Sequence, residues 1–71
     1  MNLLSAELGV TYTVDAIDTD DEELNSFLFS LGCFSGEEIT VVSRRGSGMV
    51  VAIKDGRYSI DKYLAAAIRI K

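Results

Sequence analysis

Apolar residues follow a helical spacing in one part of the chain. They stand at positions i, i+3, i+4 and i+7, which places one apolar stripe along a helix of about three turns. The stripe consists of Leu24, Phe27, Leu28 and Leu31. Gly32 follows at once, and a glycine suits the C′ position of a helix because that position needs a positive φ. The helix is therefore expected to end at Gly32.

The residues before the stripe carry the signals of a helix start. Thr19 and Asp20 are favourable N-cap residues, and Glu22 and Glu23 lie three positions further on. This spacing is typical of a capping box. We therefore expect the helix to begin near Asp20 or Asp21.

The rest of the chain shows the two-residue alternation of short strands. The expected strands cover residues 10–15, 37–44, 49–54, 57–60 and 68–70. Two turns separate the middle strands, one at 46–48 and a type I′ hairpin turn with Asp55 and Gly56 at its centre. Asp61 is expected to cap a short helical turn that runs to Ala65 or Ala66. The pattern predicts a mostly β protein with one inserted α-helix, in which five strands form a small, strongly bent barrel.

Length and composition limit the possible functions. A chain of 71 residues is expected to form a single domain, residues 1–71, that buries only about 60% of its unfolded surface and leaves little room for a deep active site. The lone cysteine, Cys33, indicates a buried, reduced thiol in a cytosolic protein. No apolar run approaches the roughly 20 residues that span a bilayer, and no signal-peptide pattern opens the chain. A cytoplasmic location is the expectation.

Charge is divided unevenly along the sequence. Residues 1–42 carry a net charge of −9 and contain no basic side chain, whereas residues 43–71 carry +5. This division could produce a dipolar surface that orients a partner. Alternatively, the two halves interleave in the fold and their charges largely cancel. The acidic total of −4 argues against binding to nucleic acid.

Motifs for catalysis and for cofactor binding are missing. The chain has no histidine to serve as a base, and no glycine-rich phosphate-binding loop. The acidic run 18–23 lacks the glycine and glutamate that an EF-hand requires at its sixth and twelfth positions, so it is better explained by helix capping. We expect a protein that is not an enzyme and has no cofactor or specific metal site.

The sequence gives better support for a protein-binding site than for a catalytic or metal site. Phe29 lies about 140° around the helix from Leu24, so it should be either exposed or held beneath a loop. If it is exposed, it could form an apolar contact patch with Phe34. The alternative is that Phe29 packs beneath the loop after Gly32 or beneath the N-terminal segment. Two arginines could pair with acidic groups on a partner or could lie at a solvated hairpin end. The candidate partner-binding residues are Leu28, Phe29, Phe34, Arg44 and Arg45.

Several of these segments together resemble the ferrous iron transport protein A (FeoA) family. The matching segments are Leu31-Gly32-x-x-x-Gly36 with Ile39 and Val41 after it, Ile60-x-x-x-x-Ala65-x-x-Ile68-x-Ile70, and the leading Leu4-x-x-x-Leu8-Gly9. The resemblance implies an SH3-like β-barrel. It also implies an accessory protein of bacterial ferrous iron uptake that acts at the cytoplasmic side on FeoB, a membrane transporter whose G-protein domain hydrolyses GTP.

Two other functions remain open on the sequence alone. Similar barrels occur at the C-terminus of metal-dependent repressors, so the chain could be a regulatory module of that kind. It could also be a general adaptor that binds proline-rich peptides, although its only tyrosines are Tyr12, Tyr58 and Tyr63 and it has no tryptophan.

Overall fold

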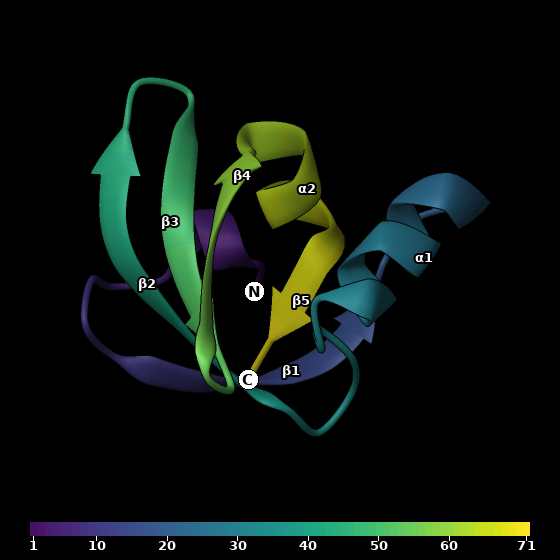
Figure 1. Ribbon diagram of the computed structural model, residues 1–71, viewed down its shortest axis with the longest axis horizontal. Coiled ribbons are helices and arrows are strands. Elements are labelled where there is room, and N and C mark those ends of the chain that lie inside the picture. Colours follow the sequence, from purple (N-terminus) through teal and green to yellow (C-terminus); the bar gives the residue numbers. More distant parts are fainter.

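Five antiparallel strands form one sheet in the order β4-β3-β2-β1-β5 (Figure 1). A computed structural model describes all residues, 1–71. The elements are the 3₁₀ helix η1 (Leu3–Ser5), β1 (Thr11–Ile17), α1 (Glu22–Ser30), β2 (Glu38–Arg45), β3 (Gly48–Ile53), β4 (Gly56–Asp61), α2 (Lys62–Ala67) and β5 (Ile68–Ile70). The mostly β prediction and the five strands are confirmed, α2 is the short helical turn expected after Asp61, and η1 is the one helical element that was not predicted.

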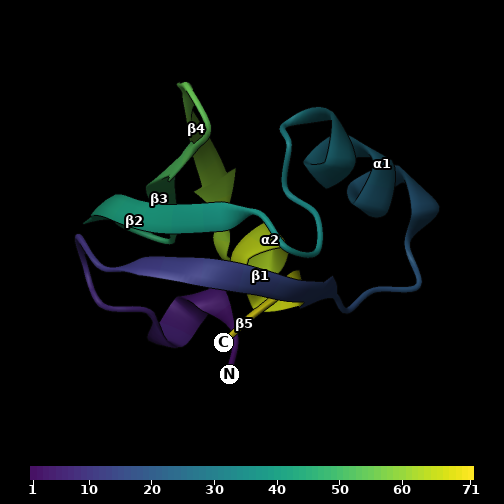
Figure 2. The same ribbon diagram turned by 90° about the horizontal axis from the view of Figure 1, so that it is seen from below.

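Strand β1 belongs to both halves of the bent sheet. Its first residues pair with β2, from Thr11 to Thr13, and its later residues pair with β5, from Val14 to Ile17, with an irregularity in register between Val14 and Ala16. Such irregularities bend a strand. The two outer strands, β4 and β5, are joined through α2 rather than by hydrogen bonds to each other. Figure 2 shows β1 running beneath α2 as the two halves diverge.

The core lies between the two halves of the sheet. Every second residue of β3 is buried, as strand periodicity requires, and η1 and α1 each add one fully buried leucine. No polar or charged residue is buried. The fully buried side chains are Leu3, Val14, Leu28, Cys33, Ile39, Val41, Val51, Ile53, Ala65 and Ile68.

Helix α1 begins at the expected place but with a different cap. The N-cap is Asp21, whose carboxylate Oδ1 accepts hydrogen bonds from the N–H groups of Glu23 (3.0 Å) and Leu24 (3.2 Å). Thr19 Oγ1 in turn accepts the N–H of Asp21 at 3.1 Å. The predicted capping box from Thr19 or Asp20 is therefore wrong, because Thr19 holds the turn that leads into the cap.

Helix α1 ends as predicted at Gly32, which has a φ of 89°. The N–H of Cys33 donates to the carbonyl of Leu28, and the N–H of Gly32 donates to that of Phe29, both at 2.9 Å. These two bonds make a Schellman motif.

The buried stripe of α1 is narrower than predicted, because Phe27 is 47% exposed. The reason is that α1 lies at the outside of the sheet (Figure 1), where only a narrow side of it meets the core.

The β3–β4 hairpin differs from the prediction by one residue. Lys54 and Asp55 form the turn, Ile53 pairs with Gly56, and Lys54 is the non-glycine residue with a positive φ, at 53°. The expected type I′ turn centred on Asp55 and Gly56 is thus wrong. Gly56 leaves space for the end of the Tyr58 side chain, because a Cβ atom at residue 56 would make that ring and hydroxyl shift.

The remaining local predictions hold to within one or two residues at the element ends. Gly46 and Ser47 form the turn between β2 and β3. Asp61 caps α2 by accepting the N–H of Leu64 at 2.9 Å. Neither α1 nor α2 has the length and apolar character that a membrane-spanning helix needs.

Candidate functional site

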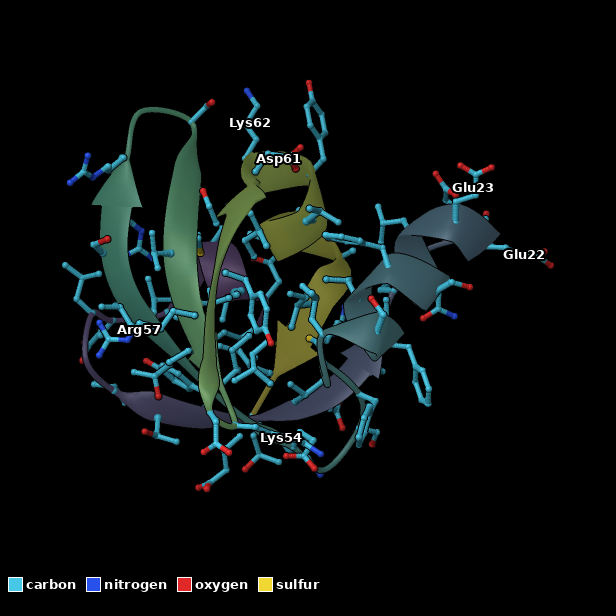
Figure 3. The ribbon with its side chains drawn as sticks, viewed as in Figure 1. Glu22, Glu23, Lys54, Arg57, Asp61 and Lys62 are labelled. Carbon is cyan, nitrogen blue, oxygen red and sulfur yellow. The ribbon has the colours of Figure 1, made fainter.

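An open groove lies between the C-terminal end of α1 and the β3–β4 turn. It has a volume of about 590 Å³. One wall comes from the last turn of α1 and the loop after it, and the other from the hairpin that carries Lys54, which Figure 3 places at the hairpin tip. The lining residues are Phe29, Ser30, Leu31, Gly32, Phe34, Ile53, Lys54, Asp55, Gly56 and Tyr58.

An aromatic pair stands at the rim of this groove. Phe29 is 64% exposed, so of the two placements that the sequence left open, exposed or covered, the structure shows the exposed one. Its ring centroid lies 5.2 Å from that of Phe34, with a tilt of 38° between the planes. The Schellman turn at Gly32 reverses the chain and returns Phe34 to the side of Phe29. Aromatic pairs at this separation are mutually stabilising.

A lysine from the opposite wall extends the aromatic pair. The Nζ atom of Lys54 lies 5.2 Å from the centroid of the Phe34 ring and 3.4 Å from Glu37 Oε1. The first distance is within the range of a cation–π interaction, and the second is that of an ion pair. Lys54 therefore links the hairpin to the loop after α1 across the groove.

The structure also places the side chains that could bind a metal or react. No group of three or more His, Cys, Asp or Glu side chains lies together anywhere in the structure. Cys33 is buried and makes no disulfide, and burial raises the pKa of its thiol to about 11. A protonated thiol inside the core is neither a nucleophile nor a metal ligand at neutral pH. Aromatic side chains, phenylalanine among them, are enriched at protein–protein interfaces.

One candidate residue, Leu28, does not reach the surface. Its side chain is fully buried in the core, and its carbonyl closes the Schellman motif with the N–H of Cys33. Leu28 thus cannot contact a partner in this fold. It holds α1 on the sheet and positions its neighbour Phe29 outward.

The two candidate arginines lie far from the groove. Arg44 and Arg45 stand at the β2–β3 end of the hairpin, whereas the groove begins at Ile53, at the other end of β3. Six residues of β3 separate these ends by roughly 17 to 20 Å. The Arg44 guanidinium donates to the backbone carbonyls of Leu4 (3.1 Å) and Ala6 (2.6 Å). Arg44 therefore fastens the N-terminal segment, and neither arginine joins the aromatic pair.

Sequence reasoning missed two residues of the groove, Lys54 and Tyr58. They lie more than twenty positions along the chain from Phe29, and only the register of the β3–β4 hairpin brings them opposite it. Gly56 was the available signal, because it leaves the space that Tyr58 occupies. Tyr12 and Tyr63 line no part of the groove, so Tyr58 is the one tyrosine there.

The acidic and basic halves of the sequence are partly interleaved. Each of the three ion pairs joins an acidic residue of the first half to a basic residue of the second. They are Lys54–Glu37, Arg69–Asp18 and Lys71–Asp15, at 3.4 to 3.6 Å. Glu22 and Glu23 make no ion pair and extend from the far end of α1 (Figure 3). The charge separation is thereby reduced.

Comparison with known proteins agrees with this architecture. The family model described as FeoA domain matches residues 1–71. Comparison with curated protein sequences yields no match. Among solved structures, FeoA of Stenotrophomonas maltophilia, complexed with zinc and described as a prokaryotic SH3 domain protein, superimposes with a TM-score of 0.89. The two chains are 20% identical over 100% of this chain and 89% of the other, and the predicted SH3-like fold is confirmed.

Two further structures are similar over nearly the whole of this chain. Iron(II) transport protein A from Clostridium thermocellum has a TM-score of 0.90 and 26% identity, covering 100% of this chain and 44% of that one. A manganese-dependent transcriptional repressor has a TM-score of 0.89 and 25% identity, covering 99% of this chain and 40% of the repressor. The same fold thus occurs in transport proteins and as part of a metal-dependent repressor.

Proposed function

Because this chain belongs to the FeoA domain family, we propose that it is a noncatalytic accessory protein of bacterial ferrous iron uptake. It acts in the cytoplasm by contact with the FeoB transporter, and residues 1–71 work as one domain. The family match over the full chain supports the pathway. A suggested role as an activating factor of ferrous iron transport, attached to the S. maltophilia protein, supports the accessory character.

The exposed Phe29–Phe34 pair carries the proposal of contact. An aromatic side chain that is 64% exposed costs solvation free energy unless a partner covers it. Its neighbours supply a shallow apolar groove and the ammonium group of Lys54. We therefore assign the partner-binding site to Phe29, Phe34 and the groove, and exclude Leu28 and Arg44.

An NMR titration tests this assignment. The isotope-labelled protein is titrated with the soluble G-protein domain of FeoB from the same organism. We expect the largest shifts at Phe29, Phe34 and Tyr58, whereas Arg45, at the other end of β3, should stay unshifted.

A matched pair of variants separates contact from folding. Phe29→Ser should abolish the shifts, whereas Phe27→Ser should retain them, because Phe27 is 47% exposed but lies about 200° around the helix from Phe29. Shifts centred on the β2–β3 turn, or binding that survives Phe29→Ser, would refute the assigned site. No binding at near-millimolar concentration would redirect the search to the membrane portion of FeoB.

A second function is favoured by one observation, the 25% identity to the manganese-dependent repressor over 99% of this chain. In this alternative the protein is a regulatory module that contacts a metal-dependent DNA-binding protein. The two functions predict different neighbouring genes, a large membrane GTPase for the first and a winged-helix protein for the second. Titration with such a repressor, in parallel with FeoB, distinguishes them directly.

A further inference from the structure

The two outer strands of the sheet differ in whether their outer edge is covered. The outer side of β5 is covered by the N-terminus, since Asn2 forms a bridge with Arg69 and the N–H of Ile70 donates to the carbonyl of Met1 at 2.9 Å. Strand β4 pairs with β3 on one side, and no strand pairs with its other side. An uncovered edge strand is a template for pairing with another chain.

The register of the hairpin shows which backbone groups face outward from β4. In a two-residue hairpin the closing pair, here Ile53 and Gly56, exchanges hydrogen bonds, and the bonding side then alternates along the strand. Arg57, Ser59 and Asp61 consequently direct their N–H groups away from β3. No backbone or side-chain bond within the chain uses the outward groups of Arg57 or Ser59.

The charged residues along this edge would be complementary between two antiparallel copies of β4. Arg57 and Asp61 lie two positions before and two positions after Ser59, at the two ends of β4 (Figure 3). Both side chains are exposed, both lie on the outer face with Ser59, and neither forms an ion pair within the chain. When two antiparallel copies are centred on Ser59, each Arg57 is opposite the Asp61 of the other copy.

We propose that β4 pairs antiparallel with β4 of a second copy of this chain, centred on Ser59. The two Ser59 residues exchange backbone hydrogen bonds across the two-fold axis. The N–H of each Asp61 donates to the carbonyl of Arg57 in the other copy, and each guanidinium faces a carboxylate. A parallel arrangement would instead align like charges, which is destabilising. The interface does not depend on contact with FeoB, and its test uses this protein alone.

The side chains leave room for these contacts. The capping bond to α2 uses Oδ1 of Asp61, so Oδ2 is available to an arginine. The side chains of Tyr58 and Ile60 point to the inner face of the sheet and are not displaced by a strand added at the edge. An isologous contact of this kind closes on itself as a dimer.

Analytical ultracentrifugation of the full chain over a range of concentrations tests the proposal. We expect an equilibrium between the 7.7 kDa monomer and a species of twice that mass. Ser59→Pro removes the N–H at the centre, and Arg57→Glu places like charges opposite each other. Each should raise the dimer dissociation constant about tenfold or more, with circular dichroism verifying that the fold is retained.

Cross-linking tests the register. Two cysteines at position 59 would have Cα atoms about 5.5 Å apart in a hydrogen-bonded pair, which suits a disulfide. Ser59→Cys should therefore form a covalent dimer in oxidised glutathione much faster than Arg57→Cys, whose two copies would lie roughly 13 Å apart along the strands.

The proposal fails on any of three outcomes. The first is a wild-type protein that stays monomeric to near-millimolar concentration. The second is a dimer whose dissociation constant is unchanged by Ser59→Pro and Arg57→Glu, and the third is equal cross-linking rates for the two cysteine variants.

Discussion

Gly32 ends α1 and also sets the shape of the groove, and the loss of stability on its replacement can be calculated. At a φ of 89°, an L-residue suffers a steric penalty of about 1–2 kcal/mol. A Cβ atom there would lie 3.4 Å from Lys54 Cδ and Cε and 3.5 Å from Ile53 Cγ2. These are ordinary contacts, so the backbone alone sets the cost. The turn that Gly32 makes also determines where Phe34 meets Phe29.

We therefore expect Gly32→Ala to lower the free energy of unfolding by about 1–2 kcal/mol. For a domain of this size the melting temperature should fall by about 5–15 °C. Urea denaturation and calorimetry of the variant beside the wild type measure both quantities. Gly32→Asn is the matched control, because asparagine enters the left-handed region more readily than alanine, and it should recover part of the loss.

Two results would refute this reasoning. If Gly32→Ala stays within a few tenths of a kcal/mol of the wild type, the positive φ does not govern the stability of the turn. If Gly32→Asn is no better than Gly32→Ala, the loss has another origin, such as crowding against the Lys54 stem.

Three other predictions use neighbouring or paired residues as their controls. Leu28→Ala should lower the free energy of unfolding by about 2–5 kcal/mol, because it leaves a cavity at a fully buried site. Phe29→Ser should leave the free energy of unfolding in urea nearly unchanged, and a large loss would contradict the exposure of Phe29. The pKa of Cys33 rises from 9.0 to about 11 on burial, so only the unfolded state ionises between these values, and stability should decline with rising pH by up to about 2–3 kcal/mol. Stability curves of the wild type and Cys33→Ala should show this decline as a difference confined to pH above 9. Arg44→Ala should lower the free energy of unfolding by about 1 kcal/mol, because it removes two hydrogen bonds to the N-terminal segment. Arg45→Ala should be nearly neutral in the same thermal unfolding assay. Equal effects of the two variants would show that Arg44 does not hold the N-terminal segment in place.

The elements that sequence reasoning placed correctly depend on local interactions. The strand periodicity, the glycine at the end of α1 and the cap at Asp61 each involve residues within a few positions of one another. Helix geometry also placed Phe29 away from the apolar stripe, but it did not decide whether a loop covers this side chain. Even the local signals had limits, since both Asp20 and Asp21 were acceptable caps, and the contact of Thr19 with the Asp21 N–H decided between them.

Contacts between distant segments of the chain determine which residues line the groove. Lys54 approaches the Phe34 ring, and Tyr58 lines the same groove, because strand pairing sets the register of the β3–β4 hairpin. Arg44 likewise donates to carbonyls 38 and 40 positions away. Local spacing therefore determined the helix, the strands and the position of Phe29 off the apolar stripe. Tertiary packing alone decided which residues face Phe29, because backbone pairing over long separations depends on the whole sheet.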